Sequence, residues 1–128
     1  MKKNANTLYH ATIYGQAVSK ANSRRMVYNK KTKKPMYIKS EKAMAYVDSF
    51  IKQTDEFRWS GPPYECKLIL HCDMYYESER PDLDESLVMD CLQKADIIKN
   101  DRLIREKHIY HFIDKKNPRV EIKLEERK

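Results

Sequence analysis

Apolar and polar residues alternate most clearly in two stretches, residues 65–76 and 118–125, which predicts two β-strands. Side chains along a strand point alternately to its two faces, so every second residue shares a face. In the first stretch one face is apolar throughout, with Cys66, Leu68, Leu70, Cys72 and Met74. In the second, Val120, Ile122 and Leu124 share the apolar face. Each strand is therefore expected to pack one face into a core.

Further strands are predicted at residues 7–14, 26–29, 36–39 and 106–113. The two short ones flank a basic hairpin tip at residues 30–35. The strand at 106–113 is expected to pair with 118–125 as a closing hairpin, with residues 115–117 at its tip.

Two helices are predicted from apolar residues at helical spacing. The first follows Ser40, an N-cap candidate, and would bury Ala43, Tyr46, Val47, Phe50 and Ile51. The second runs from about residue 83 to residue 95, with Leu83, Leu87, Cys91 and Ala95 on one face. The order of elements predicts one domain, residues 1–128, of the α/β (α+β) class, with a small mixed β-sheet and two main helices.

The net charge narrows the possible partners. Lys and Arg total 26 against 19 Asp and Glu, a formal charge of +7, which favours nucleic acid or an anionic membrane surface over mere solubility. No apolar run approaches the roughly 20 residues of a membrane span. Three cysteines without a close pair and the lack of a signal segment predict a reduced, cytoplasmic protein. Two glycines are too few for a phosphate-cradling loop.

The positive charge is concentrated between Lys20 and Lys42, where nine Lys or Arg residues accompany one acid, Glu41. Tyrosine, serine and asparagine side chains, which suit phosphates and bases, lie among them. We expect a DNA-contacting arm, although a solvated loop would have the same composition. The predicted DNA-binding residues are Lys20, Arg24, Arg25, Lys30, Lys31, Lys33 and Lys34, with Arg80 in the next motif.

The acidic residues of interest follow the strand at 65–76. Asp82 and Asp84 lie two positions apart before a predicted helix, Glu85 follows, and Asp101 comes 17 residues after Asp84. Two carboxylates on one side of an extended segment suit Mg²⁺ or Mn²⁺. The chain could leave them along the helix and come back through a short strand, which would bring Asp101 beside the pair. Such an ion could promote phosphodiester hydrolysis. Acids at a helix N-terminus also occur for capping alone, and this alternative stays open.

Several motifs resemble the RusA family of Holliday junction resolvases, small DNA endonucleases common in phages and prophages. The strand Leu68–Cys72, the motif Arg80-Pro81-Asp82-Leu83-Asp84, the helix residues Asp90-Cys91-Leu92 and the turn Asn100-Asp101 follow the family's core pattern. The similarity extends from about residue 8 to residue 125, through a loop at residues 17–22 and a closing strand at 118–122.

The resemblance implies a homodimer that binds four-way DNA junctions and nicks them symmetrically in a Mg²⁺-dependent reaction of DNA recombination and repair, with Mn²⁺ as a possible substitute. It assigns the catalytic, metal-binding aspartates to Asp82, Asp84 and Asp101, and Glu85 adds a possible fourth ligand. Two-fold symmetry in the protein matches the two-fold symmetry of a four-way junction.

The chain also departs from the family pattern. Glu85 replaces an asparagine, Asn100 replaces the first aspartate of the final turn, and Val88 stands where the family has a functionally important lysine. These departures motivate a second hypothesis, a RusA-like protein that binds branched DNA but cuts it weakly or not at all. A third, a basic subunit for RNA or for a phage structural complex, stays open on charge alone.

Overall fold

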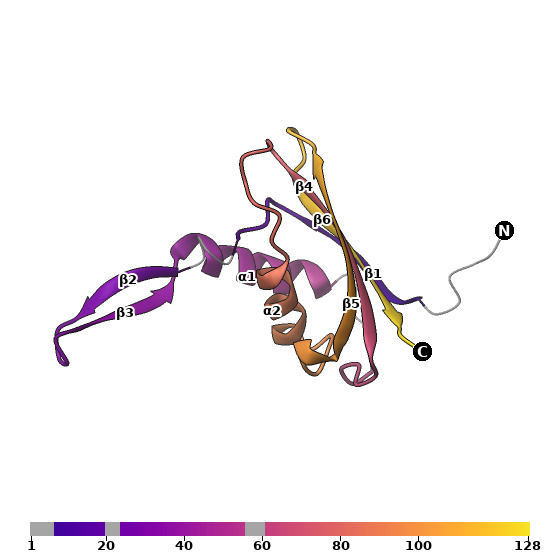
Figure 1. Ribbon diagram of the computed structural model, residues 1–128, viewed down its shortest axis with the longest axis horizontal. Helices are drawn as coiled ribbons and strands as arrows, with labels where there is room; N and C mark the ends of the chain where they lie inside the picture. The colour runs from indigo at the N-terminus through magenta and orange to yellow at the C-terminus, as the bar shows by residue number, and fades with distance from the viewer. Residues whose placement is uncertain (1–6, 20–23, 56–60) are drawn as a thin grey trace.

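The computed structural model describes residues 7–19, 24–55 and 61–128 (Figure 1). The elements, in order, are β1 (Thr7–Tyr14), β2 (Arg24–Asn29), β3 (Lys34–Lys39), α1 (Glu41–Thr54), β4 (Leu68–Tyr76), α2 (Ser86–Lys94), the 3₁₀ turn η3 (Asp101–Leu103), β5 (Ile104–Ile113) and β6 (Arg119–Glu126). A mixed four-stranded sheet with two helices confirms the predicted α+β class.

The main sheet has the strand order β1-β6-β4-β5, in which β4 pairs parallel with β5 and antiparallel with β6. The predicted hairpin between the last two strands is therefore wrong, because β4 lies between them. The connection at residues 114–118 is long enough to cross the end of β4. This arrangement gives β4, whose alternate side chains are buried, hydrogen-bonded neighbours on both sides.

Both α1 and α2 cover the same face of the sheet (Figure 1). The hydrophobic core lies between these helices and the sheet. The alternating face predicted for β4 is buried, and so is that of β6. On α1, Ser40 caps the helix by accepting the Ala43 N–H through its side chain at 3.2 Å, as predicted. The most deeply buried large side chains include Phe50, Leu68, Leu70, Met74, Tyr76, Leu87, Leu92 and Leu124.

Helix α2 begins later than predicted, at Ser86 rather than near residue 83. The Asp84 carboxylate accepts the Ser86 N–H at 2.9 Å, and this bond substitutes for the preceding helical turn. Leu83, predicted to face the core, is consequently exposed. At the other end Asp96 adopts a left-handed backbone conformation with φ 59°, which ends the helix where the sequence predicted.

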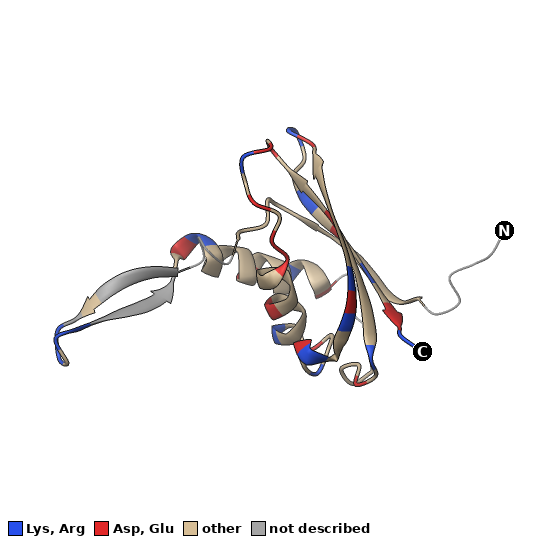
Figure 2. Cartoon of the chain, viewed as in Figure 1, with Lys and Arg blue, Asp and Glu red and all other residues tan. Residues whose placement is uncertain are grey.

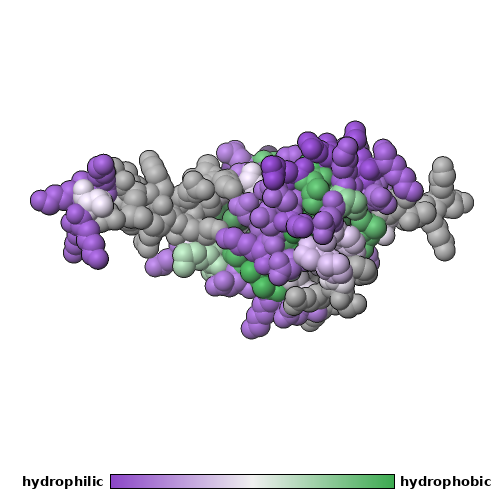
Figure 3. Space-filling view, turned by 90° about the horizontal axis from the view of Figure 1, so that it is seen from below, coloured by the Kyte–Doolittle hydropathy of each residue, from purple (hydrophilic) through white to green (hydrophobic). Residues whose placement is uncertain are grey.

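Strands β2 and β3 pair only with each other and project from the domain as a two-stranded arm (Figure 1). Its tip carries Lys30, Lys31, Lys33 and Lys34, all exposed, and Figure 3 shows this end of the molecule as hydrophilic. The predicted pair of short strands is therefore confirmed.

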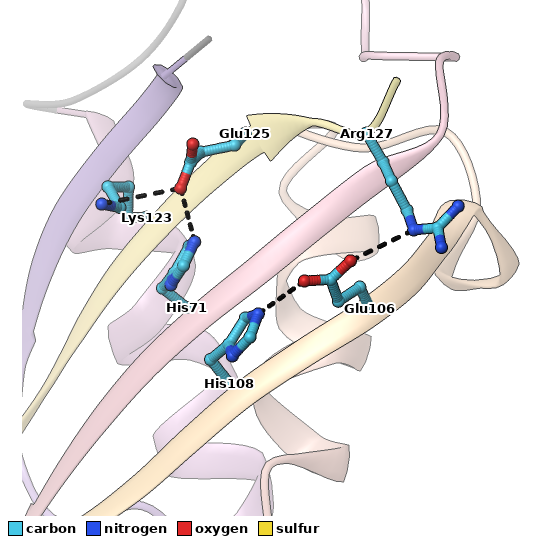
Figure 4. A network of polar contacts seen from close by, with 6 residues as sticks. All are labelled: His71, Glu106, His108, Lys123, Glu125 and Arg127. Atoms are coloured by element: carbon cyan, nitrogen blue, oxygen red, sulfur yellow. Dashed lines mark hydrogen bonds and ion pairs between the residues drawn. The ribbon is translucent and has the colours of Figure 1, made fainter. Parts of the chain in front are cut away.

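The face of the sheet opposite the helices carries a polar network (Figure 4). His71 and His108 stack with ring centroids 4.9 Å apart. Glu106 accepts from His108 at 2.7 Å and from Arg127 at 3.2 Å, and these bonds lower the pKa of the Glu106 carboxyl. The His71 ring also lies close to the Glu125 carboxylate, with 2.5 Å between Nε2 and Oε1. His111 lies on the helix side, stacked against Tyr76.

Candidate active site

The segment from residue 77 to residue 85, called the acid loop below, leads from the end of β4 to the start of α2 (Figure 2). Its first N–H, that of Glu77, donates to the side chain of Gln16 at 2.7 Å. Further along, the Tyr76 hydroxyl donates to the Asp82 carbonyl at 3.3 Å. Burial raises the pKa of Tyr76, so this hydroxyl stays protonated and able to donate. The domain thus fixes the backbone of the acid loop near its acids.

The two aspartates of the loop have different surroundings. Asp84 is half-buried, and its bond to the Ser86 N–H places the carboxylate at the positive end of α2, which stabilises the ionised form. The Asp82 side chain is exposed, and no other residue in the described ranges pairs with its carboxylate. One carboxylate is therefore held by the helix, and the other is open to a ligand from solvent.

Glu85 is paired with a cation from a neighbouring strand. Its carboxylate lies 2.7 Å from the Lys107 ammonium group of β5. Sequence analysis missed this contact, because the two residues are 22 positions apart and meet only through the parallel pairing of β4 with β5. A metal ion at Glu85 would compete with Lys107 for the negative charge of the carboxylate.

The position where the family has a lysine belongs to the core in this chain. Val88 is fully buried on α2. A positive charge beside the acid loop is nevertheless present, because Lys107 supplies it from β5.

Asp101 lies at the opposite end of α2. Its N–H donates to the Gln93 side chain at 3.0 Å, and it lines a depression of about 380 Å³ with Asp90, Lys94 and Arg102. Helix α2, whose nine residues rise by about 13 Å, runs from the acid loop to this end. Asp82 and Asp84 thus precede its first turn, whereas the Asp101 backbone contacts its last turn through Gln93. Within the described ranges, no three or more His, Cys, Asp or Glu side chains form a group that could hold a metal ion.

The predicted DNA-binding residues are distributed between the arm and the acid loop. The four tip lysines and Arg80 are exposed. Arg24 and Arg25 lie on β2, where only the backbone is described, and Lys20 lies outside the described residues. Among the described helices, none is long and apolar enough to cross a membrane.

Comparison with known proteins agrees with the motifs. The family model described as "Endodeoxyribonuclease RusA" matches residues 15–125, a range that includes the arm, both helices, the acid loop and Asp101. No curated protein matches the chain. Because the family match covers most of the sequence and the fold agrees with the predicted class, the chain belongs to the RusA family of endodeoxyribonucleases.

Proposed function

We propose that this protein is a divalent-metal-dependent Holliday junction resolvase that acts as a homodimer in the cytoplasm and cuts four-way DNA junctions by paired symmetric nicks. The observation that carries the proposal is the acid loop, in which the exposed Asp82 stands two residues before Asp84, whose carboxylate is held at the start of α2. The basic arm supplies a surface for the DNA backbone, as expected for a structure-specific nuclease of DNA recombination and repair.

The residues of the acid loop fit a hard divalent cation. Asp82 and Asp84 would hold Mg²⁺ or Mn²⁺ through carboxylate oxygens, the donors these ions prefer. When bound, the ion supplies a Lewis acid that activates water and neutralises charge on the phosphate. Tyr76 fixes the backbone of the loop at Asp82, and Lys107 competes with the ion for Glu85.

Asp101 can join this site through a second copy of the chain. A two-fold axis across the middle of α2 exchanges the two ends of the helix, which would bring the second copy's Asp101 level with Asp82 and Asp84. The placement of Asp101 at the far end of α2 from Asp82 and Asp84 motivates this arrangement. The proposed site therefore contains Asp82 and Asp84 from one protomer and Asp101 from the other.

Mixed dimers test whether the site is shared. Asp82→Asn and Asp101→Asn should each be inactive alone. When the two variants are mixed and exchanged, each heterodimer should contain one intact site and one doubly mutated site, so nicking of single strands should return without paired cutting. If both variants are inactive and the mixture stays inactive, Asp101 acts within its own chain. If Asp101→Asn alone is fully active, it is not part of the site.

The proposed function itself is tested by cleavage of a labelled synthetic four-way junction with Mg²⁺ or Mn²⁺, beside linear duplex of the same sequence. The expected result is paired, symmetric nicks in the junction, abolished by Asp82→Asn. Absence of nicks with either metal, together with tight junction binding, would favour the second candidate, a branched-DNA-binding protein. The buried Val88 at the family's lysine position is the observation that favours that candidate.

A further inference from the structure

A pocket at the base of the arm joins three segments that are distant in sequence. It is lined by the loop after β1, by Lys42 in the first turn of α1, and by Arg80 and Pro81 of the acid loop. Its volume is about 280 Å³. The bond between the Glu77 N–H and the Gln16 side chain holds two of the three segments together at the pocket wall.

The pocket has an apolar floor and a basic rim. Ala17 and Val18 are buried and form the floor. Lys42 and Arg80 are exposed at the rim, and Ser19 beside them is half-buried. No ion pair joins either cation to another described residue, whereas Lys99, Lys107, Arg119, Lys123 and Arg127 all lie beside carboxylates.

Its charge differs from that of three other pockets on the described surface. The depression at Asp101 combines two aspartates with Lys94 and Arg102. A second pocket, on the open face of the sheet, includes Asp73 and Glu121 beside Lys123, and a third includes Asp48 beside Lys94. Lys42 and Arg80 line a pocket without carboxylates, so their charges are available to an anion from outside.

The location of the pocket indicates which anion. Ser19 precedes the arm, Lys42 follows it, and Arg80 stands two residues before Asp82. Two residues of extended chain span at most about 7 Å. A DNA strand that runs from the arm to the acid loop would therefore cross this pocket next to the aspartates.

We propose that this pocket binds one nucleotide unit of the DNA strand, with its phosphate on Lys42 and Arg80 and its sugar against Ala17 and Val18. The phosphate held here is the neighbour of the one that is cut, so the pocket sets the register of the strand at Asp82 and Asp84. The inference rests on the proposed nuclease function. Lys42 and Arg80 act as positioning residues, because they bind a phosphate that does not react.

Lys42→Gln and Arg80→Gln test the pocket, and Lys52→Gln is the matched control. Lys52 is exposed on the same helix, in its last turn. The affinity for a four-way junction would be measured over a range of salt concentrations without divalent metal. Each rim variant should weaken binding several-fold and reduce the slope of log affinity against log salt by about one. The control should change neither, and melting curves should show all three variants folded.

A small ligand provides a second measurement that does not depend on cleavage. Titration with the 5′-phosphorylated dinucleotide pTpT should shift the backbone amide signals of residues 16–19 and 42, and the Lys42→Gln/Arg80→Gln double variant should lose these shifts. Unchanged junction affinity and salt slope in the rim variants would overturn the pocket even if the wild type cuts junctions. Conversely, if pTpT binds in this pocket but the protein cuts no DNA, the proposed nucleotide pocket stands and the proposed nuclease function is rejected.

Discussion

The two ends of α2 both carry aspartates, but only one end leaves negative charge uncompensated. At the N-terminal end the helix itself holds Asp84, and Asp82 stands open without a partner among the described residues. At the C-terminal end Asp90 and Asp101 share their depression with Lys94 and Arg102, beside the helix terminus that disfavours carboxylates. Lys107 pairs with Glu85 at the N-terminal end but leaves Asp82 without a cation. A cation from solution gains most at such a carboxylate, so the comparison favours the N-terminal end as the metal site.

The largest expected effect is the loss of cleavage in Asp82→Asn or Asp84→Asn. Each should reduce junction cleavage by about a thousand-fold or more, because each removes a negative oxygen ligand from the proposed ion. Asp96→Asn is the matched control, since it makes the same chemical change beyond the other end of α2 and asparagine tolerates the left-handed backbone there. Equal losses in all three variants would remove the distinction between the two ends.

Introducing the family's lysine into α2 should harm the protein rather than improve it. Val88 is fully buried, so Val88→Lys would place an unpaired ammonium in the core and reduce the free energy of unfolding by about 3 kcal/mol or more. Val88→Ala, which removes only methyl groups, separates the cost of the charge from that of the cavity. Urea unfolding gives both values, and a stable, more active Val88→Lys variant would contradict the assignment of this position to the core.

Removing the cation at the N-terminal end should strengthen metal binding. In Lys107→Gln the Glu85 carboxylate loses its ammonium partner, and Mn²⁺ should bind several-fold more tightly by calorimetry. Lys123→Gln breaks a comparable ion pair, with Glu125, on the other face of the sheet and should leave Mn²⁺ affinity unchanged. Weaker binding in Lys107→Gln would show that Lys107 supports the ion instead of competing with it.

Loosening the backbone of the acid loop should have a moderate effect. Tyr76→Phe removes the hydroxyl that donates to the Asp82 carbonyl, a bond expected to contribute about 1 kcal/mol. We expect kcat/KM to fall about five-fold, which is that energy expressed as a rate ratio. Tyr75→Phe, whose ring packs against Phe112 on the opposite face, should behave like wild type. A similar loss of kcat/KM in Tyr76→Phe and Tyr75→Phe would show that the effect comes from general destabilisation of the fold.

The smallest expected effect concerns pH. The Asp114 N–H donates to the Tyr76 carbonyl, and a hydrogen bond from Arg119 lowers the pKa of the Asp114 carboxyl below its usual 3.8. Because the folded pKa lies below the unfolded one, the carboxylate stabilises the fold above about pH 4, and this contribution is lost as the pH falls through the lowered value. The melting temperatures of wild type and Asp114→Asn should therefore differ slightly at neutral pH and converge in stronger acid. A constant difference would exclude the charge as its cause.

Local patterns predicted most elements, and long-range pairings account for what they missed. Ser40 and Asp96 mark helix ends through their own backbone and side-chain chemistry, so the sequence was sufficient there. The false hairpin arose because nothing in β5 or β6 indicates that β4 lies between them. Leu83 fitted a helical spacing, yet the Asp84 side chain started the helix after it.

In the candidate site, too, the sequence indicated the features that depend on neighbouring residues and missed those that depend on long-range pairing. The spacing of Asp82 and Asp84 indicated a metal site from neighbouring residues alone, and this interpretation stays a prediction. The Lys107–Glu85 pair, the separation of Asp101 and the pocket of Lys42 and Arg80 depend on the sheet order and on how the loops meet. No periodicity in the sequence contains that information.

The position of β6 between β1 and β4 has a consequence for synthesis of the protein. The first strand of the sheet has no partner in the described structure until β6, which follows all the other strands in sequence, has been made. A chain still attached to the ribosome at residue 113 lacks this strand and cannot join β1 to the sheet. The sheet that anchors the acid loop is thus completed only after β6 has been synthesised, so a shorter nascent chain cannot present the finished fold to DNA.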